Sequence, residues 1–486
     1  MSEINELEQA LVMVAADADS RNYEDQKLYE NDEGQEEEAI SKDSYIYTKI
    51  SDDVDTNNYP SQVINNLKES KKRQNEDLEN VTRSERESKT LKRKYENSED
   101  GVTKSQRVHS NVANEDIHQK FKRDDSEDDI TTSQRGYANV VATHYNKLEE
   151  KGLDERFKSR IVHLRNFHNW IKSMLINEYL TKIKDGKRHN APVRVHDMCC
   201  GKGGDLLKWK KGGISHLICS DIAEVSLDQC KARYTDMKNR SARDRGPNLY
   251  SIEYIAGDCS RLRLREKYSD PSMSLDLVSC QFAFHYSFES LSQAECMFRN
   301  AAECLQPGGY FIGTIPDAYE IVTRAKKCNN KSFGNKVYEV SIDFDINKPP
   351  LFGAKYNFQL DGVVNCPEFL VYFPILVKLA KKFGLKLVRT EKFYDFFERM
   401  KEEGKYLLTN MRSLEAYPAP DSVQLVGTDA SDYIHAETFI TKEQRGSLKI
   451  GTLSKSEWEV SSLYTTFVFE KVKNTWNADG TPLYDI

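Results

Sequence analysis

From residue 136 onward, short apolar runs alternate along the chain with segments of helical periodicity. Seven runs have the length and composition of strands: residues 193–198, 217–222, 252–256, 275–282, 310–315, 385–392 and 463–472. Three segments between them read as helices, at residues 206–211, 224–236 and 292–305, and no helix follows the last strand. This alternation predicts an α/β fold with a mostly parallel, seven-stranded sheet covered by helices on both faces.

Three further segments lie outside the simple alternation. Residues 160–180 carry a helical apolar stripe that includes Ile161, Leu164 and Phe167, so a helix is expected before the first strand. Residues 337–342 and 355–360 read as an inserted strand pair, and residues 401–458 form a long polar region without clear periodicity. We expect both to be insertions on the ligand side of the sheet.

The first 135 residues differ in composition from the rest. They hold 20 Lys and Arg against 33 Asp and Glu, a net charge of −13, so the whole-chain charge of −7 leaves +6 for residues 136–486. They contain two glycines, one phenylalanine (Phe121), and none of the ten cysteines or four tryptophans. Such a segment cannot bury a core, so we expect a disordered acidic tail at residues 1–135 and a basic folded domain at residues 136–486.

Short basic clusters interrupt the acidic tail, at residues 71–73, 92–94 and 120–123. They are interpreted either as solvated charge or as nuclear-import signals, and we keep import as a hypothesis. No apolar run approaches the roughly 20 residues of a membrane span, and the N-terminus does not resemble a signal peptide. We therefore expect a soluble, intracellular monomer.

The cysteines fit reduced, buried thiols better than a disulfide framework. Cys219 and Cys280, for example, occupy strand-like apolar positions. No paired C-x-x-C spacing occurs, so no metal site is expected.

A glycine-rich loop follows the first strand and opens a helix. It runs from Asp197 to Asp205 and contains Cys199 and Gly201, at the strand ends where doubly wound sheets bind ligands. It matches neither the P-loop nor a clean G-x-G-x-x-G pattern.

Acidic residues end the next two strands. Asp221 lies 20 residues after Gly201, where its carboxylate can accept both hydroxyls of a ribose, and Ile222 can pack on an adenine face. Asp258 can cap the adenine amino group. Each acid taken alone could be a helix cap or a solvated side chain. Together, however, the four acids Asp197, Asp205, Asp221 and Asp258 favour a binding site.

Two ligand classes compete for this loop. A nicotinamide dinucleotide carries a pyrophosphate, which Asp197 and Asp205 would repel. S-adenosylmethionine instead carries a positive sulfonium and ammonium, which those acids suit. The sequence therefore favours S-adenosylmethionine as cofactor.

Seven separated motifs in order resemble the eukaryotic mRNA cap guanine-N7 methyltransferases, with a close match to the yeast-type enzyme. The resemblance covers residues 137–472. It is carried by His144-Tyr145-Asn146, residues 164–173, the Gly201 loop, Asp221-Ile222-Ala223, residues 281–286, Thr314-Ile315-Pro316-Asp317 and Pro367-Glu368-Phe369. It implies a Rossmann-like class I S-adenosylmethionine-dependent methyltransferase that acts on N7 of the terminal guanosine of GpppN-capped mRNA.

The resemblance also implies two sets of site residues. The implied cofactor set comprises Lys172, Cys199, Asp205, Asp221, Asp258 and Gln281. We also expect Asp197, Gly201, Ile222 and Ala283 at this site. The cap set comprises His168, Asn169, Lys202, Lys208, Arg233, His285, Tyr286, Glu368 and Tyr464, together with Phe282 and Pro316. Aromatic faces to stack on guanine, Glu368 as an acceptor for its N1 and N2 hydrogens, and cations for the triphosphate are consistent with these roles.

Some of these residues have a simpler interpretation. Phe282, Phe284 and Tyr286 at period two could be one packed face of a strand end, and His285 a structural histidine. Lys208 or Arg233 could lie on a solvated helix face. Tyr464 fits the alternation of the last strand poorly, which indicates that it points away from the core.

Three positions depart from the family pattern. Cys199 replaces a glycine and narrows the cofactor approach, and Ala283 replaces a serine and loses a hydrogen bond on the adenine side. His168 replaces an asparagine, which would make the cap contact sensitive to pH near the reference pKa of about 6.5.

Because guanine N7 carries a lone pair and no proton, we expect no catalytic acid or base, only proximity and orientation. The resemblance implies a nuclear protein with the capped mRNA 5′ end as substrate, and as partners the phosphorylated C-terminal tail of RNA polymerase II and other capping enzymes. Two other interpretations are a non-catalytic RNA-binding scaffold, against which the intact acids argue, and methylation of arginine or a metabolite. No glutamate pair of the kind that arginine transfer needs is found near the fourth strand.

Overall fold

The computed structural model describes residues 136–147, 158–244, 246, 249–328, 331–420, 423–429, 431–442 and 449–475, all within one compact unit. The predicted acidic tail and its basic clusters lie outside these residues. No helix in this part of the chain is long and apolar enough to cross a membrane.

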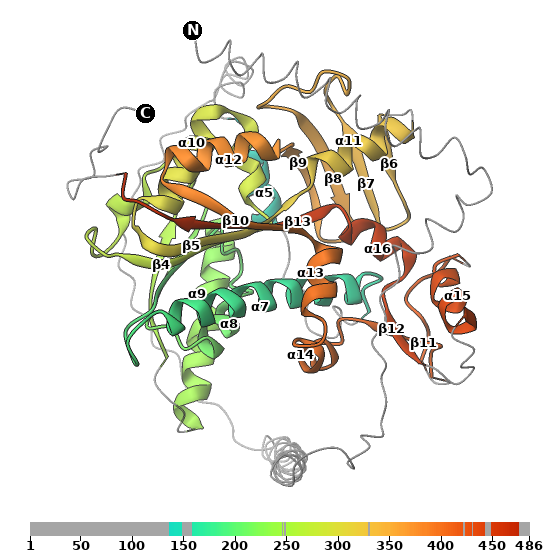
Figure 1. Ribbon diagram of the computed structural model, residues 1–486, viewed down its shortest axis with the longest axis horizontal. Coiled ribbons are helices and arrows are strands. Elements are labelled where there is room, and N and C mark those ends of the chain that lie inside the picture. The colour runs from blue at the N-terminus through green and yellow to red at the C-terminus, as the bar shows by residue number, and fades with distance from the viewer. Residues whose placement is uncertain are drawn as a thin grey trace, which may run out of the picture. The chain divides into compact units, whose positions relative to one another are not determined.

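A seven-stranded sheet forms the centre of the unit, in the order β10-β13-β5-β4-β1-β2-β3 (Figure 1). The strands are β1 (Arg194–Met198), β2 (His216–Asp221), β3 (Ser251–Ala256), β4 (Leu275–Gln281), β5 (Leu305–Pro316), β10 (Leu385–Lys392) and β13 (Tyr464–Lys471). β1 to β5 pair in parallel, and β13 runs antiparallel to both of its neighbours, β5 and β10. The predicted mostly parallel sheet of seven strands is confirmed.

Helices cover both faces of this sheet (Figure 1). α7 (Val162–Asp185), α8 (Leu206–Lys211) and α9 (Glu224–Arg243) lie on one face, and α10 (Leu291–Ala302) and α12 (Phe373–Lys382) lie on the other. Successive strand residues point to opposite faces, so Leu277 joins the core under α7 while Val278 joins the core under α10 and α12.

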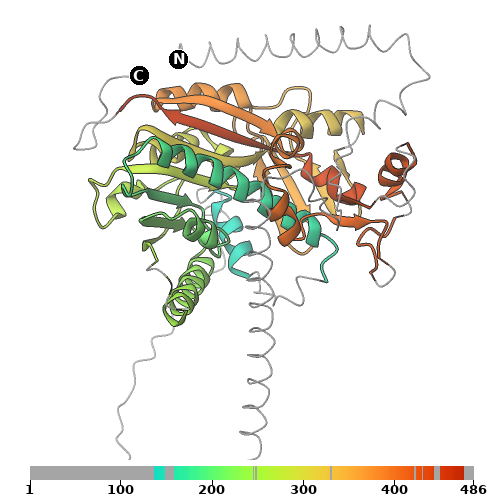
Figure 2. The ribbon, with the colours of Figure 1, turned by 60° about the horizontal axis from the view of Figure 1, so that its bottom comes forward.

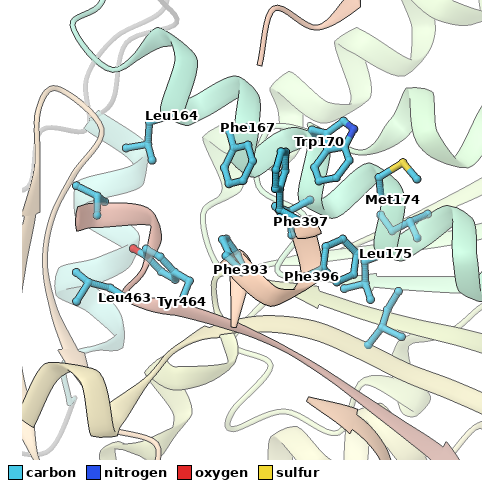
Figure 3. Packing of buried hydrophobic residues seen from close by; sticks show 14 of the residues in the cluster. Leu164, Phe167, Trp170, Met174, Leu175, Phe393, Phe396, Phe397, Leu463 and Tyr464 are labelled. Carbon is cyan, nitrogen blue, oxygen red and sulfur yellow. The ribbon is translucent and has the colours of Figure 1, made fainter. Parts of the chain in front are cut away.

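α7 is buried on more than one side because α13 (Phe393–Met400) packs on it. Figure 3 shows Phe167 and Trp170 of α7 facing Phe396 and Phe397 of α13. The ring centroids of Phe167 and Phe397 are 5.4 Å apart. Twelve of the 24 residues of α7 are buried, which explains why its sequence is apolar on a wide face.

The first insertion is larger than predicted. It is a four-stranded antiparallel sheet made of β6 (Ser332–Gly334), β7 (Tyr338–Ile342), β8 (Lys355–Leu360) and β9 (Val364–Phe369). The sequence predicted only β7 and β8, because β6 has three residues and β9 contains Pro367, which does not suggest a strand.

The second insertion is folded as well, with elements too short to show a period. Residues 401–458 contain α14 (Lys405–Asn410), β11 (Glu415–Tyr417), α15 (Ile434–Lys442), β12 (Ile450–Thr452) and most of α16 (Lys455–Ser461). β11 pairs with β12, and Tyr433, Ala436 and Ile450 form a small core of their own.

Two predicted boundaries were wrong. Leu305 ends no helix and instead starts β5, where the register shift after Leu275 accommodates the Gln306–Gly309 turn. β4 ends at Gln281, and a 3-10 helix follows at Phe284–Glu289. Phe284 therefore faces the core from a helical turn, so the strand-face interpretation of residues 282–286 is wrong.

Candidate active site

A pocket of about 350 Å³ lies beyond the carboxyl ends of the parallel strands, closed on one side by α5 (Ala138–Lys147). A pocket of this size falls at the lower end of the range for small-molecule sites. It is lined by all ten residues of the predicted cofactor set: Lys172, Asp197, Cys199, Gly201, Asp205, Asp221, Ile222, Asp258, Gln281 and Ala283.

Backbone turns with positive φ shape the loop under this pocket. Cys199, Gly201 and Gly203 have φ of 56°, 52° and 72°. A side chain at Gly203 would place its Cβ 2.7 Å from the Cys230 sulfur, so only glycine fits. Cys199, where the resemblance led us to expect glycine, adopts a left-handed conformation at a cost of about 1 kcal/mol.

Asp221 holds this loop in place. Its Oδ2 accepts a 2.7 Å hydrogen bond from the backbone N–H of Gly201, and its Oδ1 accepts one of 2.8 Å from that of Ala223. Burial raises the pKa of Asp221, while these two N–H groups act in the opposite direction. The carboxylate is thus fixed at the pocket wall, and each oxygen keeps a lone pair for a ligand hydroxyl.

Two lysines converge on Asp205. The Nζ atoms of Lys172 and Lys208 lie 2.8 Å and 2.6 Å from Asp205 Oδ1. Burial alone would raise the pKa of Asp205, but the two ammonium groups outweigh it and lower the pKa. Lys208 also donates a 2.6 Å hydrogen bond to Asn169 Oδ1. Asn169 and Lys208, both predicted at the cap, lie in this ion cluster and do not line the pocket.

Asp197 has a different electrostatic character from its neighbour. It is buried, and its Oδ2 accepts a 3.0 Å hydrogen bond from Trp209 Nε1. Burial and the nearby Asp205 raise its pKa well above the usual range. Asp197 and Asp205, expected as a matched pair of acids at the loop, therefore differ: the pKa of Asp205 is lowered, whereas that of Asp197 is raised.

Gln281 and Asp258 offer hydrogen-bond acceptors at the pocket wall. Gln281 donates through Nε2 to Ser279 Oγ at 3.0 Å, whereas its buried Oε1 has no hydrogen-bond partner among the described residues. Asp258 Oδ1 accepts from both the backbone N–H and the hydroxyl of Ser260. A buried acceptor without a partner is costly, so this wall suits a ligand with N–H donors, such as an adenine amino or an ammonium group.

Four rings form an aromatic cluster that meets the pocket at Phe282: His168, Phe282, Phe393 and Tyr464. His168 stacks on Phe282 with centroids 5.3 Å apart and planes at 17°, and Tyr464 meets Phe282 edge-on at 5.2 Å. Figure 3 shows Tyr464 pointing into the core beside Phe393, so the expectation that it points outward was wrong.

His168 is electrically neutral in this cluster. Burial, with a smaller contribution from Lys172, lowers its pKa to about 3. The expected titration of this side chain near 6.5 is therefore wrong. Its Nε2 has no hydrogen-bond partner within the described residues.

Three buried side chains, Tyr356, Glu368 and His285, form a polar group. Tyr356 donates a 2.8 Å hydrogen bond to Glu368 Oε2, and His285 Nε2 lies 3.4 Å from Glu368 Oε1. Tyr286, next to His285, lines the pocket and shares a 3.3 Å hydrogen bond with Tyr145 of α5. Glu368 and His285 are buried and do not line the pocket in this structure.

The remaining cap candidates are dispersed. Lys202 lines the pocket from the loop, whereas Arg233 is exposed on α9 away from it. Pro316 ends β5 and pairs with Tyr464 across the sheet. The structure thus brings Lys202, Phe282 and Tyr286 of the cap set to the pocket wall.

α5 supplies a wall that the sequence did not assign. Ala138, Val141 and Tyr145 of α5, together with Tyr137 directly before the helix, line the pocket. α5 contacts α9 and β9, and Figure 2 shows it, in cyan, beside the green α9. The motif His144-Tyr145-Asn146 was the available signal, because Asn146 Oδ1 accepts a 3.2 Å hydrogen bond from Val225 N at the start of α9.

Residues 129–472 match the mRNA (guanine-N(7))-methyltransferase domain family. The mRNA cap guanine-N(7) methyltransferase of Drosophila melanogaster is 52% identical over 347 residues, covering 71% of this chain and 80% of that protein. A solved structure, the CcbJ methyltransferase from Streptomyces caelestis, has a TM-score of 0.36 at 13% identity and covers 69% of this chain and 98% of that one.

The specific likeness to a yeast-type enzyme is not supported. The mRNA cap guanine-N(7) methyltransferase of Schizosaccharomyces pombe is 37% identical over 273 residues, covering 55% of this chain and 71% of that protein. The Drosophila protein is more similar over a longer stretch.

The strand order, with one antiparallel strand, β13, between β5 and β10, is that of the expected class I methyltransferase fold. The match to the family covers most of the chain and includes every element of the central sheet. The chain therefore belongs to the mRNA (guanine-N(7))-methyltransferase family, and it is an S-adenosylmethionine-dependent enzyme that methylates N7 of the guanosine capping mRNA.

Proposed function

We propose that the pocket holds S-adenosylmethionine and that the aromatic cluster receives the cap guanine. Phe282 carries this proposal, because it lines the pocket and is at the same time the ring on which His168 and Tyr464 pack. A cofactor in the pocket and a guanine at the aromatic cluster would therefore both contact Phe282. Phe282 has φ of 58°, a turn that directs it away from the line of β4.

The residues of the pocket suit the parts of the cofactor. Asp221 is placed to accept the ribose hydroxyls, and Ile222 and Ala283 offer apolar contact to the adenine. Asp258 and the unpartnered Oε1 of Gln281 can accept N–H groups. Lys172, held by Asp205, can neutralise the methionine carboxylate.

The reaction requires little general acid–base catalysis from the protein. When bound, S-adenosylmethionine supplies an electrophilic methyl group on its sulfonium. Guanine N7 carries a lone pair and no proton, so no side chain has to remove one, and we assign no catalytic acid or base. The residues of the site instead align the two molecules and exclude water.

Glu368 and Lys202 are assigned to recognition of the cap. The Glu368 carboxylate can accept the N1 and N2 hydrogens of guanine, and Lys202 at the pocket wall can contact the triphosphate. Glu368 itself, like Lys208, Asn169, Arg233, His285 and Pro316, does not line the pocket, so the contact of all six residues with the cap stays a prediction.

Methyl transfer from labelled S-adenosylmethionine tests this function with two RNAs that differ only at the 5′ end. We expect label in RNA ending in GpppN and none in RNA ending in pppN. Equal transfer to both would contradict recognition of the cap, and no transfer to either would contradict the activity itself.

We also propose a nuclear protein that contacts the phosphorylated C-terminal tail of RNA polymerase II and other capping enzymes. The substrate is made during transcription, and residues 1–135 carry basic clusters between acidic stretches. Fusion of residues 1–135 to a fluorescent reporter should enrich the reporter in the nucleus. An even distribution would rule out import by this segment.

A further inference from the structure

Three cysteine side chains that are far apart in the sequence meet behind the cofactor loop. Cys200 follows β1, Cys219 lies in β2 and Cys230 lies in α9. Their sulfur atoms are all within 4.8 Å of one another. No other cluster of this kind, built from His, Cys, Asp or Glu, occurs in the described part of the chain.

The spacing of the sulfurs is close to that of a metal site. A zinc–sulfur bond is about 2.3 Å, so three thiolates around one ion have sulfurs about 4 Å apart. The observed separations therefore require a contraction of less than about 1 Å. Sulfur ligands select soft ions, among them zinc, over magnesium or calcium.

Of the three cysteines, Cys200 alone lines the pocket. Cys219 and Cys230 are fully buried, whereas Cys200 is partly exposed and lines the cofactor pocket. Gly203 closes over the Cys230 sulfur so tightly that a Cβ there would approach it to 2.7 Å. An ion would thus reach the thiols from the pocket, past Cys200.

Simple packing is the alternative, since free cysteines often fill buried space as small apolar side chains. Packing explains one or two buried thiols at this junction but does not require three sulfurs to converge from a loop, a strand and a helix.

We propose that Cys200, Cys219 and Cys230 bind one soft d10 cation, with Zn²⁺ as its representative. Three thiols release three protons to solvent, three metal–sulfur bonds form, and no electron is transferred. A water molecule can complete the coordination on the pocket side. Because the three ligands belong to the β1 loop, β2 and α9, the bound ion would fix the loop that shapes the cofactor pocket.

The test uses the full-length, chelator-treated protein and the metals alone. Titration with Cd²⁺ should produce thiolate-to-metal charge-transfer absorption that saturates at one ion per chain. Added Zn²⁺ should displace the Cd²⁺ and abolish this absorption. The Cys219→Ser and Cys230→Ser variants should lose affinity by more than the roughly 10- to 100-fold that outer-shell partners contribute. Cys304→Ser is the matched control, since Cys304 is buried outside the cluster, and it should bind as wild type.

A second measurement needs no variant and so does not depend on whether the serine variants fold. Zn²⁺ should slow alkylation of Cys200 by iodoacetamide, mapped by mass spectrometry, while the exposed Cys328 reacts at an unchanged rate. Unchanged labelling of Cys200, absence of the charge-transfer band, or a band that survives in both serine variants would each overturn the proposal. Neither measurement uses the cap or the cofactor, so failure here leaves the methyltransferase assignment intact.

Discussion

Tyr356 of β8 and Glu368 of β9 are paired on neighbouring strands of the inserted sheet, and the tyrosine hydroxyl donates a 2.8 Å hydrogen bond to the carboxylate. Both side chains are buried. The other carboxylate oxygen lies 3.4 Å from His285 Nε2. A side chain proposed to read the guanine is therefore oriented by the insertion on one side and by the 3-10 helix on the other.

Replacing Glu368 should separate cap recognition from cofactor binding. In Glu368→Ala, guanine loses the acceptor for its N1 and N2 hydrogens, and we expect kcat/KM for GpppN RNA to fall by about 100-fold or more. The Kd for S-adenosylmethionine, measured by calorimetry, should stay within about twofold. Tyr356→Phe leaves the carboxylate in place but less constrained, so its loss should be smaller, about 10-fold. Wild-type turnover in Glu368→Ala would refute the assigned role.

The central sheet and the cofactor wall were predictable because both follow from local patterns. Apolar runs gave the seven strands, and glycines and acids at their ends gave Gly201, Asp221 and Asp258. The aromatic cluster was harder, because Phe393 contributes from a helix whose position depends on packing against α7. The lowered pKa of His168 and the raised pKa of Asp197 could not be predicted, because these shifts arise from burial that only the fold creates.

His168 provides a test of that burial. With its pKa lowered to about 3, the ring stays neutral in the folded enzyme from pH 8 to pH 5. The pH profile of kcat/KM should therefore run parallel in wild type and His168→Asn, and a step near pH 6.5 present in wild type alone would contradict this.

The same group should contribute to instability in acid. The unfolded chain binds a proton near pH 6.5 that the folded chain excludes, so stability falls as the pH drops below that value, by about 2 kcal/mol at pH 5. His168→Asn should show a smaller loss of Tm between pH 7.5 and pH 5 than wild type. His189→Asn, at an exposed position, should behave as wild type.

Cys199→Gly should relax the cofactor loop. The substitution relieves a residue with φ of 56° and removes a side chain from the pocket wall, so we expect S-adenosylmethionine to bind a few-fold more tightly. Relief of about 1 kcal/mol of strain opposes the lost packing and the greater entropy of the unfolded chain, so Tm should change little. Weaker cofactor binding would show that the thiol makes a favourable contact.

Glu457 should give the opposite pH dependence to His168. Its Oε1 accepts a 2.9 Å hydrogen bond from Leu164 N of α7, and its burial raises its pKa to about 7. A carboxyl with a raised pKa stabilises the fold most below its unfolded value of about 4.5, and that stability is lost as the pH rises towards 7, by about 3 kcal/mol in full. Glu457→Gln should flatten this part of the stability curve, measured by urea unfolding from pH 4.5 to 7.5. The exposed Glu437→Gln is the control and should leave the slope unchanged.

α5 sets the N-terminal limit of the catalytic domain, which we propose spans residues 136–486. Tyr137 N donates to Glu289 Oε1 at 3.2 Å, and Tyr145 shares a hydrogen bond with Tyr286 at the pocket. A chain that begins at Arg135 keeps these contacts and should match the full-length protein in kcat/KM with GpppN RNA. A chain that begins at Leu148 lacks the whole helix, so the pocket loses the wall formed by Tyr137, Ala138, Val141 and Tyr145. We expect it to remain folded by circular dichroism, because the central sheet is untouched, but to bind S-adenosylmethionine at least about 10-fold more weakly. An inactive but folded chain from Arg135 would instead assign part of the catalytic machinery to the acidic tail.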